Sequence, residues 1–462
     1  MHRKSVSPKN IESPFNPDEM FFSITDLKGI ILSGNDVFVR VSKYSRDELV
    51  GSPHNIIRHP DMPRIVFKLL WDYIQSGRPI AAYVKNMAKD GSYYWVLATV
   101  MPVKDKNGKN LRYLSIRIKP TTEYLPLVAK LYRELLEAEK KGGMEASYEK
   151  LVEALKSLGY DNYDSFMKEI LSKEVLSKKD ILTVEKVEKI KEKSGFYSIM
   201  DRIFTYAREL NRLYDEIYKK IDVFDEFASL LKKKSDTIFG LTGHIRLISL
   251  NSSVESFKLG SEGAAFSVMS AEMRKNSELG NKIIGQMKEK IQEIMSDIEK
   301  MIVLINISKL QVIMLTRFLR EILDNLEEEN SDSSEKQLES DIRDILNLLV
   351  YNAEDIMLIS KNVHRRLREI DESMKRVKIL IKRLEFLYLN GMVEAAHNTR
   401  SNFAIIFSEV NRLVESTREV LTSIFAPLYE VLHKNKVMAE EFERVNRLIE
   451  EIYSQLDSIV HT

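Results

Sequence analysis

The stretch Asn55-Ile-Ile-Arg-His-Pro-Asp-Met-Pro63 decides how the first quarter of this chain folds. It holds two prolines, and Pro53 lies just before it. Each proline fixes φ and removes a backbone donor, so the stretch can continue neither a helix nor a central strand, and we expect a stiff, irregular loop. A stiff loop that also carries Arg58, His59 and Asp61 suits a small-molecule pocket better than a packed core.

The residues around this loop predict a domain of mixed strands and helices. Residues 22–32 form two short strand-like runs separated by a hairpin-like turn. Residues 63–75 carry apolar residues at helical spacing. Two further strand-like runs, 83–86 and 93–102, flank a Lys-Asp-Gly turn, and 111–118 alternates as a final strand.

Taken in order, the sequence blocks over residues 18–120 resemble the PAS domain of bacterial aerotaxis receptors, the Aer type. The blocks are Phe22-Ser-Ile-Thr-Asp-Leu-Lys-Gly29, Asn35-Asp-Val-Phe38, Val41-Ser-Lys-Tyr44, the loop above, Trp71, Val84-Lys-Asn86, Lys89-Asp-Gly-Ser-Tyr-Tyr-Trp95 and Met101-Pro-Val103. The resemblance implies a five-stranded antiparallel sheet with helices on one side. It also implies FAD, held without a covalent bond.

The resemblance and the side-chain chemistry together give a set of candidate cofactor-binding residues. Arg58 can neutralise a pyrophosphate or donate to a flavin carbonyl, and Asp61 can hold that arginine. Trp71 and Tyr94 can stack on the ring, although both are equally well explained as core aromatics. The full predicted set is Asn35, Arg58, His59, Asp61, Trp71, Asn86 and Tyr94.

One segment departs from the aerotaxis pattern. In that family a tryptophan follows the proline, whereas this chain reads Gly77-Arg-Pro-Ile80, and a glycine of the pattern is replaced by Ala82. FAD remains the first expectation for the cofactor. The alternatives are haem, held through His54 or His59, and no cofactor.

Composition excludes several classes of protein. Lys plus Arg number 70 and Asp plus Glu 69, so no net charge attracts nucleic acid. With no cysteine, the chain has neither disulfides, nor thiolate metal sites, nor cysteine catalysis. No signal peptide is apparent, and the most apolar stretch, 301–318, is interrupted by polar residues. We therefore expect a cytoplasmic protein without a membrane span.

The rest of the chain is predicted to be almost wholly helical. Ten of the eleven prolines lie at or before Pro126, and the other is Pro427, which we expect to kink its helix locally. A connector with breaks at Gly142-Gly143 and Gly159 comes first. A coiled-coil seam with spacings of three and four follows: Ile342, Leu346, Leu349, Ala353, Ile356, Ser360, Val363, Leu367, Ile370, Met374, Val377, Ile381, Leu384 and Tyr388.

An internal repeat lies in this helical region. Leu250-Asn-Ser-Ser-Val-Glu-Ser-Phe257 parallels Leu389-Asn-Gly-Met-Val-Glu-Ala-Ala396, and residues 266–272 parallel residues 403–409. Both copies resemble the hairpin tip of methyl-accepting chemotaxis receptors. The first copy departs from that pattern at Lys258, Ser261, Ala264 and Ala265, and the second copy is more divergent.

These observations predict a multidomain chain, with an α+β PAS domain followed by a long all-α antiparallel coiled coil or four-helix bundle. The predicted segments are an N-terminal extension (1–17), the PAS domain (18–122), a helical connector (123–196), a first hairpin with its tip near 261 (197–327), an acidic linker (328–337) and a second hairpin with its tip near 400 (338–462). With two hairpins in one chain, we expect either a monomeric pseudo-dimer or an ordinary homodimer.

The predicted function is redox or oxygen sensing in energy taxis, without enzymatic turnover. The resemblance implies that the tips, Glu255–Arg274 and Glu394–Glu409, contact the kinase CheA and the coupling protein CheW, or other chemoreceptors. Two alternatives remain open at this point: a haem-based gas sensor, and a cofactor-free scaffold that binds other receptors. A hypothesis from a different functional class is a flavin enzyme with a helical oligomerisation tail. Nothing in the sequence resembles a substrate site for such an enzyme.

Overall fold

The structure is a computed structural model, and it describes residues 6–105, 107–179, 181, 195–325, 332–397 and 402–459. The chain divides into two compact units. Unit 1 comprises Met1–Tyr218, Ile302–Ile356 and Glu441–Thr462, and unit 2 comprises Lys219–Met301 and Met357–Glu440. Each unit is described by itself.

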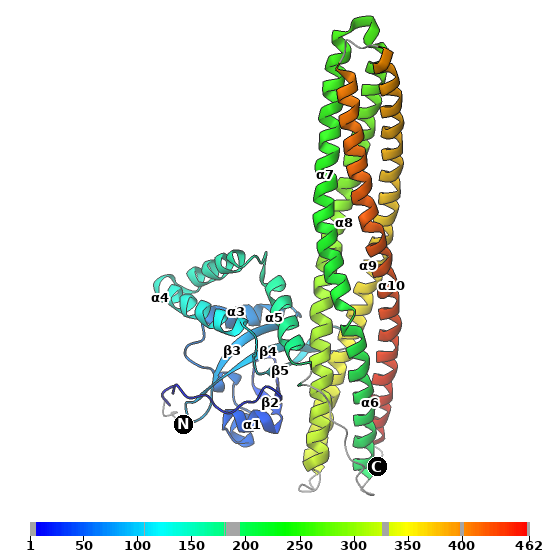
Figure 1. Cartoon of the computed structure of the whole chain (residues 1–462). Helices are drawn as coiled ribbons and strands as arrows, with labels where there is room; N and C mark the ends of the chain where they lie inside the picture. The colour runs from blue at the N-terminus through cyan, green and yellow to red at the C-terminus, as the bar shows by residue number, and fades with distance from the viewer. Residues whose placement is uncertain are drawn as a thin grey trace. The chain divides into compact units, whose positions relative to one another are not determined.

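Unit 1 begins with a five-stranded antiparallel sheet of order β2-β1-β5-β4-β3 (Figure 1). Its strands are β1 (Met20–Thr25), β2 (Ile31–Gly34), β3 (Ile80–Met87), β4 (Tyr93–Lys104) and β5 (Asn110–Ile118). Between β2 and β3 the chain forms α1 (Asp36–Ser42), α2 (Arg46–Leu49), the 3-10 turn η1 (His54–Ile57) and α3 (Arg64–Gln75). The predicted sheet with helices is confirmed.

The strands give the sheet two chemically different faces, because successive side chains of a strand point to opposite sides. On the central pair, Ser23 of β1 lies opposite Ser115 of β5, and Phe22 lies opposite Ile116. The face that carries the two serines looks toward η1 and α3, whereas Phe22 packs edge to face on Phe318 of a helix at 4.9 Å between ring centroids. The face that carries Phe22 is called the outer face.

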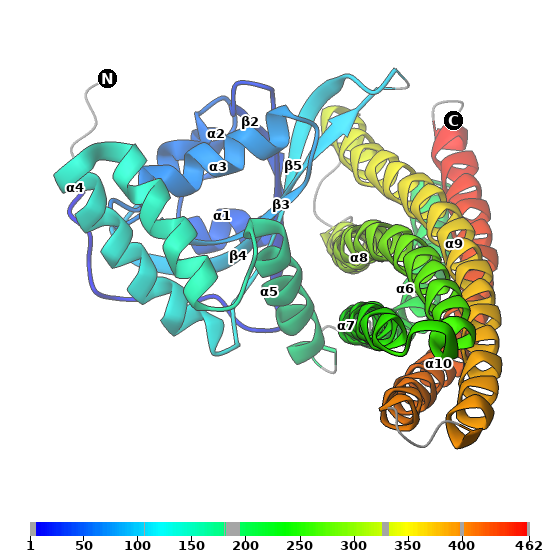
Figure 2. The same cartoon turned by 90° about the horizontal axis from the view of Figure 1, so that it is seen from above.

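The connector consists of α4 (Tyr124–Ser157) and α5 (Tyr163–Ser177). Non-helical φ/ψ values at Gly142 and Gly143 divide α4 into two pieces, which Figure 2 shows as separate rods. A fully buried carboxylate, Glu174 of α5, accepts hydrogen bonds from the Tyr83 hydroxyl and from the backbone N–H groups of Thr121 and Thr122. These bonds attach α5 to β3 and to the segment after β5.

Unit 1 also contains the helix α6 (Gly195–Tyr218) and parts of three longer helices. These are α8 (Ala264–Asn325), α9 (Asp332–His397) and α10 (Phe403–Ile459). Their unit 1 portions bury an apolar core with one amide pair inside it, in which the Asn352 Nδ2 donates to Gln311 Oε1 at 3.0 Å. The sequence predicted an acidic linker at 328–337, but α9 already begins at Asp332. The rest of that linker lies outside the described residues.

Unit 2 consists of α7 (Ile221–Lys258), the 3-10 turn η2 (Gly260–Gly263) and the remaining parts of α8, α9 and α10. The predicted first tip near 261 coincides with η2, and the second tip near 400 lies outside the described residues. Phe266 and Phe403, which the repeat placed at equivalent positions, stack face to face with ring centroids 3.7 Å apart.

The seam predicted along α9 is buried at every position except Tyr388, which is half-buried. Pro427 lies inside α10, and the helix continues through it. One segment, Gly260–Asp324, is long and apolar enough to cross a membrane by length and composition, but 89% of its most apolar window is buried within the structure.

Candidate ligand-binding pocket

A cavity of about 270 Å³ lies between η1, α3 and the serine-bearing face of the sheet. Its walls are mainly apolar, with Ile57, Phe67, Leu70, Trp71, Ile74, Val84, Ala98 and Val100. Its polar lining comes from Ser23, Thr25, Lys28, His54, Asn55, Arg58, Asn86, Tyr113, Ser115 and Arg117. Apolar walls with a few convergent polar groups are typical of small-molecule sites, and the volume is near the lower end of their range.

A buried arginine is the main electrostatic feature of the pocket. Arg117, 4% exposed, donates to His54 Nε2 at 2.7 Å and to Ser23 Oγ at 3.0 Å. Its guanidinium also lies 5.4 Å from the Phe21 ring centroid and 5.7 Å from that of Phe38. Among the described residues, no carboxylate forms an ion pair with it. A buried cation without an anion is costly, so the pocket carries a positive charge that a ligand can neutralise.

The burial of this pair fixes the protonation state of the histidine. Burial, and then the positive charge of Arg117, lower the pKa of His54 to about 3. Burial lowers the pKa of Arg117 to about 10, so the guanidinium remains charged at neutral pH. Because arginine can only donate, the neutral His54 accepts at Nε2 and carries its proton on Nδ1.

Three of the predicted cofactor-binding residues lie in this pocket. Arg58 lies above the Phe67 ring at 4.2 Å and donates to the Met62 carbonyl at 3.2 Å. Trp71 packs edge to face on Tyr113, with ring centroids 5.8 Å apart. Asn86, 4% exposed, lines the cavity and makes no side-chain hydrogen bond to a described residue. An isolated antiparallel bridge joins the Arg58 and Asn86 backbones.

The structure places the other four predicted residues outside the pocket lining. His59 is buried beneath the loop and accepts the Asp61 N–H at Nδ1, at 3.1 Å. The Asp61 side chain, 58% exposed, pairs with Lys85 at 2.6 Å. Tyr94 is a core aromatic beside Phe21, as the alternative interpretation proposed.

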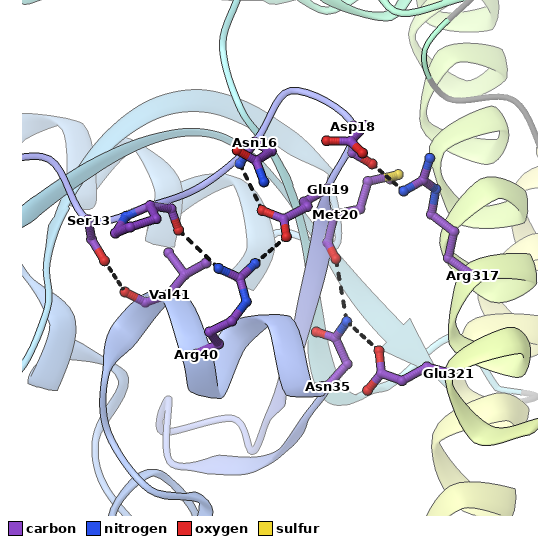
Figure 3. A network of polar contacts seen from close by, with 11 residues as sticks. Ser13, Asn16, Asp18, Glu19, Met20, Asn35, Arg40, Val41, Arg317 and Glu321 are labelled. Carbon is purple, nitrogen blue, oxygen red and sulfur yellow. Dashed lines mark hydrogen bonds and ion pairs between the residues drawn. The ribbon is translucent and has the colours of Figure 1, made fainter. Parts of the chain in front are cut away.

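The fourth residue, Asn35, lies at the junction between the sheet and α8. Its Oδ1 accepts the Phe22 N–H at 3.1 Å. Its Nδ2 donates to the Met20 carbonyl at 3.4 Å and to Glu321 of α8 at 3.1 Å (Figure 3). Asn35 therefore contributes to the packing between the sheet and the helices, on the side away from the pocket.

The sequence analysis missed Arg117 and Ser115, and it gave His54 a role only under the haem alternative. A signal for the first two was present. Residues 111–118 alternate, and the series 113, 115, 117 puts Arg117 on the same side as Tyr113 and Ser115. His54 could not be found in this way, because only the fold brings it to Arg117.

The pocket has free hydrogen-bonding capacity for a ligand. The Ser115 hydroxyl is buried without a hydrogen-bond partner among the described residues, and Asn86 lines the cavity. Buried polar groups left in this state usually mark a missing partner. A flat heteroaromatic ligand with polar edges, one of which can carry negative charge, fits these groups, and the isoalloxazine of a flavin has this chemistry.

A protein-family model described as the PAS fold matches residues 31–117. The N-terminal region of this chain is a PAS domain. Over 123 residues, 27% of this chain, the sequence is 42% identical to the aerotaxis receptor of Escherichia coli K12 and covers 24% of that receptor. The PAS region is also 28% identical over 89 residues to phototropin-2 of Oryza sativa subsp. japonica, which is 19% of this chain and 10% of phototropin-2.

A third relative is the biofilm dispersion protein BdlA of Pseudomonas aeruginosa, 27% identical over 88 residues, which is 19% of this chain and 21% of BdlA. The chain thus spans a quarter or less of the length of each of these relatives. The similarity to the aerotaxis receptor lies over the PAS region, and the region that follows in this chain is long and helical.

Proposed function

We propose that this chain is a cytoplasmic signal transducer of energy taxis that senses redox state or oxygen through FAD in its PAS pocket. The observation that carries the proposal is the pocket itself, in which the unpaired charge of Arg117 and the free Asn86 and Ser115 groups meet between apolar walls. The 42% identity to an aerotaxis receptor over this region supports the same function.

Each pocket residue has a role in this proposal that follows from its position. Trp71 and Phe67 bound the cavity and exclude water from the ring. Asn86 and Ser115 offer hydrogen bonds to polar atoms on the ring edge. Arg58, at the rim of the loop, can bind an anionic group such as a pyrophosphate. Arg117 favours whichever ligand state carries more negative charge, because no carboxylate among the described residues pairs with it.

When bound, FAD would supply reversible electron transfer coupled to a change in charge. The protein's part is to register that change. His54 and Ser23 hold the guanidinium of Arg117 in place from η1 and β1, so a change in the charge facing Arg117 acts on hydrogen bonds between two elements of the domain. A sensor of this kind needs no catalytic turnover.

The proposed output surface lies on unit 2. Two sets of exposed apolar residues occupy equivalent positions of the internal repeat: the first tip stripe (Leu247, Leu250, Val254, Val268) and the second tip stripe (Phe386, Leu389, Val393, Ile405), each residue 42–71% exposed. Clustered exposed apolar residues mark protein-binding surfaces. The resemblance to chemotaxis receptors makes CheW and CheA the proposed partners, and the duplication gives each chain two docking surfaces.

The haem alternative has less support from the geometry. His54 is a pocket histidine, but its Nε2 already accepts hydrogen bonds from Arg117 and Ser23, and His59 lies outside the cavity lining. An iron ligand at His54 would have to displace a charged donor.

The absorbance spectrum of the purified full chain tests the proposal. We expect the two visible bands of an oxidised flavin, lost on reduction with dithionite and recovered in air. A Soret band would instead show that the bound cofactor is haem. A chain that has no visible absorbance, and does not acquire any when incubated with FAD, would support the cofactor-free scaffold and overturn the sensor proposal.

A further inference from the structure

The outer face of the PAS sheet lies on the unit 1 portions of α8 and α9, and polar contacts surround the apolar part of this interface. At its centre Phe22 packs on Phe318, and the Gln311 side chain meets the Met101 sulfur at 3.3 Å. At one edge the Arg317 guanidinium bonds the Asp18 carbonyl (Figure 3). At the other, Lys104 donates to the Tyr351 hydroxyl at 2.7 Å.

Two carboxyl groups on the helices are held in this interface by neutral donors alone. Glu321 of α8 accepts the Asn35 amide at 3.1 Å and the Asp36 N–H at 2.8 Å. Asp341 of α9, 4% exposed, accepts the Ser33 hydroxyl and the Gln337 amide, both at 2.8 Å. Neither carboxyl group forms an ion pair with a described residue. A third, Asp344, differs, because it pairs with Arg112 of β5 at 2.7 Å.

The charged groups around each site compensate these carboxylates only in part. Near Glu321, the PAS side presents Asp36 and Arg46, which pair with each other, and α8 presents Arg317, which bonds the Asp18 carbonyl; the charge of Arg46 opposes the rise in the pKa of Glu321. Near Asp341, Arg112 is paired with Asp344. Farther along the interface, Lys104 faces Asp355. An ionised carboxylate at either position thus loses water without gaining a direct ion pair to a described residue, which disfavours contact between sheet and helices.

We propose that the PAS sheet and the helices α8 and α9 form a releasable clamp, closed when Glu321 and Asp341 are protonated and weakened when they ionise. The clamp comprises Ser33, Asn35 and Asp36 on the PAS side and Glu321 and Asp341 on the helices. These non-covalent contacts hold the PAS domain on the helices independently of the connector, which joins the two parts covalently. The inference does not depend on what occupies the pocket.

The direction of the pH effect follows from the burial of the two groups. Burial raises the pKa of Glu321 from 4.5 to about 7. The hydrogen bond from the Asp36 N–H opposes this rise, and the negative charge of Asp36 adds to it. Burial raises the pKa of Asp341 from 3.8 to about 6. Once the clamp opens, both groups return toward their ordinary values. The closed state therefore binds more protons, and its advantage is complete at acid pH and is lost as the pH rises through about 6 to 7.

The clamp also lies one residue from the pocket. Ser23, which accepts from Arg117, directly follows Phe22, whose N–H is bonded to Asn35, and Asn35 in turn donates to Glu321. A displacement of β1 at Ser23 would move both ends of this short chain of contacts. The clamp can thus be opened from the pocket as well as by pH.

The absence of native cysteines allows a direct test in the full chain. Exposed Asp47 of the PAS domain and exposed Glu354 of α9 are changed to cysteine and labelled with a fluorescent donor and acceptor. We expect energy transfer to fall as the pH is raised from about 5 to about 8, because each ionisation weakens the closed state by up to about a hundredfold. In E321Q/D341N, which keeps the hydrogen-bond acceptors and removes both charges, transfer should stay high throughout.

D324N is the matched control, since Asp324 is an exposed acid of α8 paired with Arg320, and it should keep the parent's pH response. The single variants E321Q and D341N, with folding checked by circular dichroism, should each remove part of the response. Energy transfer that does not change with pH in the parent, or a response retained in full by E321Q/D341N, would overturn the clamp.

Discussion

At the scale of single residues, Arg117 is the group whose position is hardest to explain by packing alone. It is 4% exposed, and it contacts a neutral histidine, the Ser23 hydroxyl, the Ser115 carbonyl at 3.5 Å and two aromatic rings. Replacing buried charges by apolar residues of similar size often leaves a fold unharmed or stabilises it. Its location beside the cavity is consistent with the role toward a ligand proposed for it above.

Arg117→Met should therefore separate binding from stability. Ser23 can still donate to His54 Nε2, 3.2 Å away, so the histidine keeps a partner and we expect the free energy of unfolding to change by no more than about 1 kcal/mol. Flavin affinity should fall by about tenfold to a hundredfold, as expected for the loss of a charged donor. Urea denaturation and FAD titration measure the two effects.

Arg40→Met is the control for this substitution. Arg40 is exposed on α1 and pairs with Glu19, so its replacement should affect neither quantity beyond about 0.5 kcal/mol. If R117M binds flavin as tightly as the parent, the role given to the buried charge is wrong.

The candidate site was only partly predictable from the sequence, for a geometric reason. The motif around Arg58 identified the loop, and Arg58, Trp71 and Asn86 do line the cavity. Adjacent residues of an irregular loop point in different directions, however, and His59 and Asp61 turn away from the cavity. Arg117 meets His54 only because β5 pairs with β1, a long-range contact that the motif does not contain.

At the scale of elements, the internal repeat explains how the unit 2 helices pack near their tips. Phe266 of α8 and Phe403 of α10 are both fully buried and stack on each other, with Phe407 beside them. Phe257 of α7, only a few residues from the turn, is 89% exposed. Two phenylalanines in one tip therefore have opposite roles, one in the core and one on the surface.

Phe266→Ala should destabilise unit 2 by about 3–5 kcal/mol, because it removes a ring and leaves a cavity. Phe257→Ala should alter stability by less than about 0.5 kcal/mol. Thermal unfolding followed by circular dichroism compares the two variants. Equal effects of the two substitutions would contradict the packing described for the tip.

The tip stripes give a separate prediction about binding. Val254→Lys places a charge in the first stripe and Val393→Lys in the second, at exposed positions where folding should tolerate it. If CheW docks on these surfaces, each variant should lose one of two binding sites, and the double variant should bind at least about tenfold more weakly, since desolvating a buried unpaired charge is costly.

Leu358→Lys introduces the same charge at an exposed leucine of α9 away from the stripes and should leave binding intact. Calorimetric titration with purified CheW gives both stoichiometry and affinity. Unchanged binding by V254K/V393K would exclude the stripes as the docking surface.

The helices themselves were the more predictable elements. The three-and-four spacing along α9 identified the buried positions from 342 to 384, because a regular period constrains a helix face more strongly than any local motif. Local composition was a poorer guide to where a helix begins. The acidic and serine-rich composition near 332–337 suggested a linker, yet α9 includes these residues.

At the scale of the whole molecule, the question is whether the two hairpins of one chain bury each other's apolar faces. In unit 2 the first hairpin contributes Phe266 and Lys290, and the second contributes Phe403 and Glu369. The rings stack, and Lys290 lies 2.5 Å from Glu369. In unit 1, Tyr214 of α6 packs edge to face on Phe442 of α10, with centroids 6.1 Å apart. The apolar faces of both hairpins are thus covered within one chain.

A chain that covers its own seam has no need of a second copy to complete the bundle, so we predict a monomer at micromolar concentration. Size-exclusion chromatography with light scattering should give the mass of one chain, independent of dilution. If the seam instead formed between chains, dimers would persist on dilution and F266A would dissociate them. In that case the two tip stripes of one chain would belong to different bundles, and the dimeric particle would carry four CheW sites, still two per bundle.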